Sequence, residues 1–249
     1  MKLLALILAL AVTVTPGSTD LPSLSTVKKT IAVYYGDPGT GKAAKHSPYV
    51  TEMKKLLVAP PAYTENAAIV VDVDDTTLLT YNMEVGAYEF EFDRATKDRW
   101  VKYAKFPATP GMVEYLNSAA SAGFTIFAVT GRAKKYAADT KRNLAKVGYP
   151  AMALYTKACT CSTVAYKSGV RQKIQARGYD IVLNIGDQYS DLAGGYADTT
   201  IKLPNPMYYI GPVNKKTRTS FNLKSDGSSG LTAGGEGIPN FDLVEKYRK

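Results

Sequence analysis

An apolar run in the first third of the chain restricts the fold more than any other feature. Residues 67–73 read AAIVVDV, a segment dominated by small and β-branched apolar side chains. Such a run is typical of a strand that is buried on both faces, as strands of a parallel sheet are. It therefore predicts a parallel sheet with helices packed on it.

Strand-like and helix-like segments alternate after this run. A helix is expected to begin with Thr109 as its N-cap and Pro110 in its first turn, and to end at Gly123. The other expected helices span 136–147 and 162–177, and the other expected strands span 124–129, 151–155, 181–185 and 200–203. This alternation predicts one parallel α/β domain over 19–249, with no second domain boundary.

The remaining segments are less regular. Residues 25–55 are expected to be largely helical, with a break at the turn-rich stretch 36–41. Polar and aromatic residues fill 81–106, and the glycine-rich stretch 227–237 is expected to be a flexible loop.

The N-terminus has the pattern of a secretory signal peptide. Lys2 precedes the apolar run Leu3–Val14, and turn-forming residues follow it. The run is shorter than the roughly 20 residues of a membrane span; the alternative is an N-terminal core helix. We expect residues 1–18 to be removed and the mature protein to be secreted, outside the cytoplasm and without a membrane partner.

The chain is basic. Its 31 Lys and Arg exceed its 22 Asp and Glu, which gives a net charge of +9, and loss of Lys2 with the signal peptide leaves +8. This excess permits anionic partners but names none. The charge suggests a nucleic-acid-binding protein as one hypothesis, but the basic residues are scattered along the chain and form no evident basic face, so no nucleic-acid partner is expected. The oligomeric state is left open.

Polar residues that follow the expected strands are candidates for a site, because ligands of open α/β sheets bind beyond the carboxyl ends of the strands. Asp72 and Asp74 leave the first strand, and two carboxylates this close repel each other unless a cation or a shared proton relieves them. Mg²⁺ prefers such oxygen ligands. The alternative is a solvated acidic turn.

Thr130 and Gly131 leave the second strand, where a hydroxyl and turn amides can hold phosphate oxygens. Asp187 follows Gly186 after the fourth strand, and Asp191 comes four residues later. In both places the alternative is a plain turn with an N-capped helix. Lys167 lies early in the preceding helix, where most lysines are simply solvated.

Taken together, these groups resemble the haloacid dehalogenase (HAD) superfamily of phosphotransferases. More narrowly, the chain resembles the secreted acid phosphatases of the plant vegetative storage protein and class B type (subfamily IIIB). The resemblance rests on Asp72-Val73-Asp74-Asp75-Thr76, Phe106-Pro107-Ala108, Pro110-Gly111, Val129-Thr130-Gly131-Arg132, Tyr166-Lys167-Ser168, Gly186-Asp187-Gln188-Tyr189-Ser190-Asp191 and Leu203-Pro204-Asn205-Pro206-Met207-Tyr208. It implies a three-layer Rossmann-like fold with a small cap insertion at about 78–108.

The resemblance also implies a function: hydrolysis of small phosphomonoesters with Mg²⁺ as cofactor. Asp72 would be the nucleophile that forms an aspartyl-phosphate, and Asp74 the general acid and base. Asp72 and Asp187 would hold the metal through their carboxylates, and Asp74 through its backbone carbonyl.

The same resemblance gives the remaining site residues their roles. Thr130 and Gly131 would bind the phosphoryl group, and Lys167 would neutralise its charge and that of Asp72. Asp191 would orient the lysine or a metal-bound water without ligating the metal. The alternative function is a storage or binding protein of this fold with little activity. Retention of the full set of site residues argues against it.

Other signals carry less weight. Residues 36–42 have the spacing G-x-x-x-x-G-K of a nucleotide-binding loop, but Ala43 stands where Ser or Thr would bind Mg²⁺, so we interpret the stretch as a turn. His46, the only histidine, is expected in a surface loop. Cys159 and Cys161 can form a small disulfide ring, remain free thiols or pair with another molecule.

Overall fold

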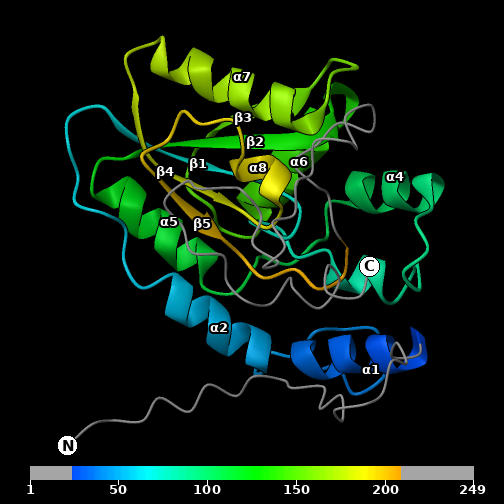
Figure 1. Cartoon of the computed structure of the whole chain (residues 1–249). Coiled ribbons are helices and arrows are strands. Elements are labelled where there is room, and N and C mark those ends of the chain that lie inside the picture. Colours follow the sequence, from blue (N-terminus) through cyan, green and yellow to red (C-terminus); the bar gives the residue numbers. More distant parts are fainter. Residues whose placement is uncertain (1–23, 209–249) are drawn as a thin grey trace, which may run out of the picture.

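The computed structural model describes residues 24–208, and a five-stranded parallel sheet lies at its centre (Figure 1). The strands are β1 (Ala67–Val71), β2 (Thr125–Ala133), β3 (Ala153–Lys157), β4 (Asp180–Gly186) and β5 (Thr199–Lys202). They lie in the order β3-β2-β1-β4-β5, and every neighbouring pair is parallel. The predicted parallel α/β sheet is confirmed, and the apolar run forms its central strand.

Helices connect the strands and cover the sheet. They are α1 (Leu24–Tyr35), α2 (Pro48–Leu56), α3 (Tyr81–Glu84), α4 (Arg94–Tyr103), α5 (Met112–Ser121), η1 (Lys134–Tyr136), α6 (Ala137–Lys146), α7 (Thr163–Gln175) and α8 (Tyr189–Leu192). The largest, α7, lies on one side of the sheet, whereas α5 and α2 lie on the other (Figure 1). The arrangement is the three-layer fold that the resemblance implied.

The alternation of β1 side chains explains the two layers. Ala68 and Val70 face α7 and pack with Val170 and Ile174 in a small apolar cluster. The larger cluster lies on the opposite face, where the neighbouring residues of the strand pack against α5 and α6. Because β1 is buried on both faces, every residue from 67 to 71 is apolar.

The start of α5 differs from the prediction. Thr109 is not its N-cap: Gly111 takes that place, at φ 78°, and the helix begins at Met112. The Thr109 N–H donates to the carbonyl of Thr77 at 2.9 Å, and Ala108 bridges Leu78. Pairing with the segment after β1 thus engages the Thr109 N–H, and the helix begins two residues later than predicted.

The end of β2 also differs. We expected the strand to end at Val129 with a turn over 130–132, but β2 continues to Ala133. Thr130 pairs with Thr156 of β3 and Ala133 pairs with Lys157, so the register shifts between these two pairs. Thr130 is therefore not a helix N-cap, and Gly131 and Arg132 occupy the irregular part of the strand.

The segment 78–108 connects β1 to α5 and carries the short helix α3 and the helix α4, which packs against α6. We call it the cap insertion. Among residues 24–208, no helix has the length and apolar character of a membrane span. The predicted signal peptide 1–18 and the predicted loop 227–237 lie outside the described residues, as do both ends of the predicted domain 19–249.

Three minor signals are placed by the structure. In 36–42 the Asp37 carboxylate accepts the N–H groups of Gly39 and Thr40, which makes a polar turn, and the next helix after this turn, α2, starts only at Pro48. His46 is exposed, as predicted. Cys159 and Cys161 form a disulfide before α7, with their Cα atoms 5.2 Å apart.

Candidate active site

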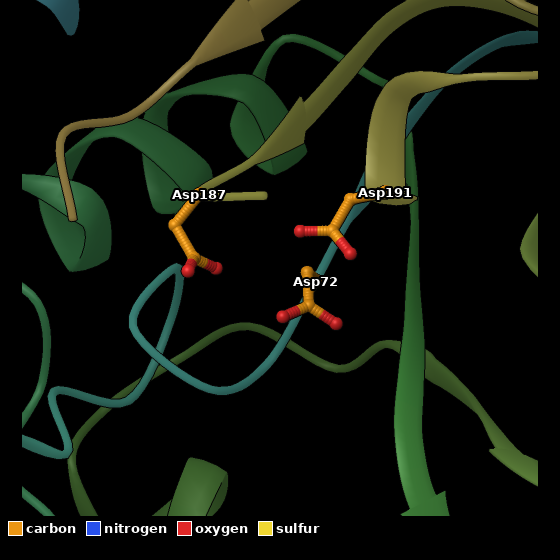
Figure 2. A group of neighbouring side chains, drawn as sticks. All are labelled: Asp72, Asp187 and Asp191. Carbon is orange, nitrogen blue, oxygen red and sulfur yellow. The ribbon is translucent and has the colours of Figure 1, made fainter. Parts of the chain in front are cut away.

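The loops after β1 and β4 bring three acidic side chains together at one edge of the sheet. Asp72 follows β1, Asp187 follows β4, and Asp191 lies in α8 (Figure 2). One carboxylate oxygen from each lies within 4.8 Å of the others, and all three residues are buried. Pairing of β1 with β4 fixes this arrangement, because the Asp72 N–H continues the ladder by donating to the carbonyl of Ile185 at 3.0 Å.

A single lysine lies between two of these carboxylates. Lys167 projects from α7, is 3% exposed, and its Nζ donates to Asp72 Oδ1 and, at 2.7 Å, to Asp191 Oδ1. Ser162 caps the start of α7 by accepting the N–H of Ala165 at 3.1 Å. The helix thus brings a cation to Asp72 at the carboxyl end of β1, which is 95 residues away in sequence, and to Asp191 after β4.

Asp187 is held in a fixed orientation by three donors. Thr76 Oγ1 donates to its Oδ1 at 2.9 Å, while the side-chain amides of Gln188 and Asn205 donate to its Oδ2 at 2.7 Å and 2.8 Å. These donors come from the loops after β1, β4 and β5. A carboxylate oriented in this way is suited to holding a cation.

Asp191 reaches the same space because a glycine leaves room for it. Its Oδ2 accepts the backbone N–H of Gln188 at 2.9 Å, which closes a capping box at the start of α8. A Cβ on Gly186 would lie 2.5 Å from the Asp191 Cβ, so no other residue fits there without displacing that carboxylate. Asp191 is thereby placed to accept the hydrogen bond from Lys167.

Asp74 belongs to a different ion pair. Its carboxylate accepts hydrogen bonds from Arg132: Nε lies 3.1 Å from Oδ1 and 3.2 Å from Oδ2, and an Nη lies 2.6 Å from Oδ1. Burial raises the pKa of Asp74, but Arg132 and then Lys97 outweigh it and lower that pKa to about 2. The Asp74 carboxylate is therefore engaged by Arg132, and it is not part of the acidic cluster of Asp72, Asp187 and Asp191.

Thr130 and Gly131 lie on β2, the neighbour of β1. Thr130 is fully buried, and its Oγ1 accepts the N–H of Arg132 at 3.1 Å. Gly131 is exposed, with open space where a Cβ would stand. Thr130 is therefore connected to the loop after β1 by way of Arg132, which pairs with Asp74 of that loop. In the described part of the chain, neither Thr130 nor Gly131 forms a direct hydrogen bond with Asp72.

The charge balance of the acidic cluster fits a divalent cation. Burial, opposed by Lys167 and reinforced by the neighbouring carboxylates, raises the pKa of Asp72 well above its usual range. Burial together with Asp191 and Asp75 raises the pKa of Asp187 to about 7. Lys167 contacts two of the three buried carboxylates, and the buried Lys202 acts on Asp187 and Asp191, so the two ammonium groups still face three carboxylates; the oxygen donors of these carboxylates match the preference of Mg²⁺.

Four positions around the site have partners that sequence reasoning did not identify. Arg132, Thr76 and Asn205 were noted as parts of motifs but received no role. Arg171 was missed altogether: it is 1% exposed and donates to the carbonyls of Asp191, Ala193 and Gly195, which fastens the α8 loop to α7. The signal available in the sequence was its spacing, because a residue four positions after Lys167 lies on the same face of a helix.

The metal-free protein is expected to lose stability as the pH rises. A carboxyl whose pKa is higher in the folded protein than in the unfolded chain takes up a proton on folding. For Asp187 the free energy of unfolding therefore falls between about pH 4 and its folded pKa of about 7. In EDTA we expect Tm to be about 5 °C lower near pH 8 than near pH 5, as measured by circular dichroism.

Two controls accompany this measurement. Asp187→Asn removes the titrating group, so the decline of Tm with pH is expected to become shallower. Mg²⁺ should raise Tm of the unaltered protein more near pH 8 than near pH 5, because metal and protons compete for the same oxygens. A Tm that is equal at both pH values in EDTA contradicts the prediction.

Comparison with known proteins agrees with this architecture. The family model of the HAD superfamily, subfamily IIIB (acid phosphatase), matches residues 27–211. A stem 28 kDa glycoprotein of Glycine max is 38% identical over 150 residues, which cover 57% of this chain and 59% of that protein. Acid phosphatase 1 of Solanum lycopersicum is 32% identical over 154 residues, which cover 57% and 58%. The chain thus spans less than two thirds of each relative.

A solved structure shares the fold. The class C acid phosphatase of Bacillus anthracis superimposes with a TM-score of 0.56 at 24% identity, over 74% of this chain and 86% of that one. The family model covers the cap insertion, all five strands and every carboxylate of the site. This chain therefore belongs to subfamily IIIB of the HAD superfamily, the acid phosphatase subfamily.

Proposed function

We propose that this protein is a Mg²⁺-dependent phosphatase that hydrolyses small phosphomonoesters through an aspartyl-phosphate. The observation that supports it most is the contact of one buried lysine, Lys167, with both Asp72 and Asp191 beside a third carboxylate, Asp187. Such a set suits phosphoryl transfer, in which catalysis consists mainly of positioning and charge stabilisation.

In the proposed first step an oxygen of Asp72 attacks phosphorus in line with the leaving alkoxide. Lys167 neutralises charge on the phosphoryl group, while Thr130 and Gly131 bind its oxygens. Asp191 keeps the lysine ammonium in place. The products of this step are the aspartyl-phosphate on Asp72 and the alcohol.

Asp74 is proposed to move the protons. It gives one to the leaving oxygen, and in the second step it removes one from the water that hydrolyses the aspartyl-phosphate. Arg132 favours the ionised carboxylate, which suits the second step. Release of Asp74 from Arg132 when the ester binds would raise its pKa toward the value that the first step needs.

Asp72 and Asp187 would hold the Mg²⁺ by their carboxylates and Asp74 by its backbone carbonyl. The bound cation supplies positive charge that stabilises the transferring phosphoryl group and offsets the carboxylates around it. Thr76, Gln188 and Asn205 keep Asp187 turned toward that place.

Removal of divalent metal is expected to stop turnover. Treatment with EDTA followed by desalting should lower the rate of p-nitrophenyl phosphate hydrolysis by at least about 100-fold, because several kcal/mol of charge stabilisation are lost. Restoring Mg²⁺ should restore the rate. In Asp187→Asn protein, much higher Mg²⁺ concentrations should be needed. Unimpaired hydrolysis after exhaustive chelation would exclude the metal from the mechanism.

The same assay decides the alternative, a storage or binding protein of this fold with little activity. The resemblance to vegetative storage proteins favours that alternative, whereas the retained set Asp72, Asp74, Thr130, Lys167 and Asp187 favours an enzyme. Turnover should be tested across nucleotides, sugar phosphates and phosphoamino acids with and without Mg²⁺. Absence of turnover on all of them, by folded and metal-loaded protein, supports the storage protein.

We further propose secretion after removal of residues 1–18, a single domain over 19–249 and the cap insertion at about 78–108. The first proposal rests on the basic, apolar and turn-forming segments of the N-terminus. N-terminal sequencing of protein secreted by a eukaryotic host tests it: a new terminus between Gly17 and Asp20 is expected, and a retained Met1 contradicts it.

A further inference from the structure

The cap insertion places a second cation beside Asp74. Lys97, on α4, has its Nζ 3.9 Å from Asp74 Oδ2, and its side chain is 35% exposed. The partner Asp74 already accepts three hydrogen bonds from Arg132, whose side chain is 1% exposed. The charge of Asp74 is therefore largely balanced without Lys97, which stands on the solvent side of the pair.

Lys97 is held in this place by the packing of α4. Asp93 caps the helix by accepting the N–H groups of Ala95 and Thr96. Trp100, one turn after Lys97, stacks on Phe106 with ring centroids 5.8 Å apart. Phe106 in turn lies under the guanidinium of Arg132 at 5.2 Å. The helix that carries Lys97 is thus packed against the partner of Asp74.

The proposed reaction gives this lysine a position relative to the substrate. If Asp74 protonates the leaving oxygen, the leaving group lies against the Asp74 carboxylate. A substituent a few atoms farther along the leaving group then comes within reach of the Lys97 ammonium. An ammonium near the surface attracts a carboxylate or a phosphate and gains a charge-assisted hydrogen bond from it.

We propose that Lys97 forms a subsite for an anionic group on the leaving alcohol, so that the enzyme prefers phosphomonoesters whose alcohol carries a carboxylate or a second phosphate. This inference rests on the proposed function, because it takes the leaving group to lie at Asp74. It adds a substrate class: doubly anionic small esters rather than phosphomonoesters in general.

Glu84 on α3 interacts electrostatically with both Lys97 and Asp74. Burial raises the pKa of Glu84 to about 7, Lys97 acts in the opposite direction, and Asp74 raises it further. Below that pH the Glu84 carboxyl is neutral and leaves the charge of Lys97 available. The subsite is therefore tested in acid, near pH 5.5.

The test compares two esters with the same carbon skeleton, 3-phosphoglycerate and glycerol 3-phosphate. Lys97→Met should lower the ratio of their kcat/KM values about tenfold, mainly through KM, because one charge-assisted hydrogen bond is lost. Lys97→Glu should lower the ratio further and favour phosphoethanolamine, whose alcohol is cationic. Lys102→Met, a substitution on the same helix, is the control and should leave the ratio unchanged.

The outcomes separate the two proposals. An equal loss on both glycerol esters in Lys97→Met means that Lys97 only supports Asp74, and it overturns the subsite. If the unaltered protein hydrolyses neither these esters nor p-nitrophenyl phosphate, the proposed function fails. Wherever neither glycerol ester is hydrolysed, the subsite is decided by calorimetric binding of both esters to the unaltered protein in the presence of Mg²⁺. Tighter binding of 3-phosphoglycerate that Lys97→Met abolishes supports it, and equal affinities overturn it.

Discussion

Asp72→Asn is expected to abolish turnover of an aryl phosphate while the protein remains folded. An amide oxygen is a poor nucleophile, so kcat should fall by at least about 1,000-fold. The fold should persist because asparagine has almost the same shape as aspartate. Lys167 also keeps its contact with Asp191 at 2.7 Å. Initial rates with p-nitrophenyl phosphate and a far-ultraviolet circular dichroism spectrum measure the two effects.

The stability of this variant provides an independent readout. Asp72 is one of three buried carboxylates whose oxygens lie within 4.8 Å, and its replacement relieves their repulsion in metal-free protein. Tm in EDTA should therefore be no lower than that of the unaltered protein. Asp198→Asn, at an exposed position before β5, is the matched control and should retain full activity.

Acid quenching tests the covalent step. Unaltered protein that is mixed with a labelled ester and rapidly denatured should carry acyl phosphate, whereas Asp72→Asn protein should carry none. Wild-type activity in Asp72→Asn protein, or equal labelling of both proteins, would show that another group is the nucleophile.

Lys167→Met is expected to cost both activity and stability. Methionine retains most of the length of lysine but leaves Asp72 and Asp191 without their shared cation. Loss of one partner from a buried ion pair typically destabilises a protein by about 3–5 kcal/mol. Turnover should fall by at least about 100-fold, since the phosphoryl charge is no longer neutralised. Urea unfolding in EDTA and initial rates measure these effects.

A second substitution tests the physical cause. Adding Asp191→Asn to Lys167→Met removes one of the uncompensated carboxylates, so it should recover part of the lost stability but none of the activity. Lys173→Met, on an exposed part of α7, should change neither property. An equal free energy of unfolding for Lys167→Met and unaltered protein would contradict the prediction. It would mean that Asp72 and Asp191 take up protons without any loss of stability.

The parallel sheet could be predicted because each strand is marked by a pattern of neighbouring residues in the sequence. The run at 67–71 is apolar throughout, and each later strand is separated from the next by a helix-length segment, so fold class and strand positions follow from periodicity and turn residues. The residues that meet at the acidic cluster also follow, since the carboxyl ends of parallel strands share one edge.

The errors arose where distant segments decide the local structure. The extended backbone at Thr109 depends on Thr77, and the extension of β2 past Thr130 depends on pairing with β3. Neither partner is visible in the local pattern. The same holds for the pairing of Asp74 with Arg132, 58 residues apart in sequence, because nothing near either residue indicates the other.

The central position of β1 in the sheet has a consequence for the folding of the newly synthesised chain. Its partner β4 is made more than a hundred residues later, and Lys167 is 95 residues from Asp72. A nascent chain therefore carries an apolar strand with one open edge until β4 arrives, and only that last docking gathers the acidic cluster. Under the proposed function, a chain that holds the divalent cation has already paired β1 with β4, and the bound ion opposes the separation of these strands.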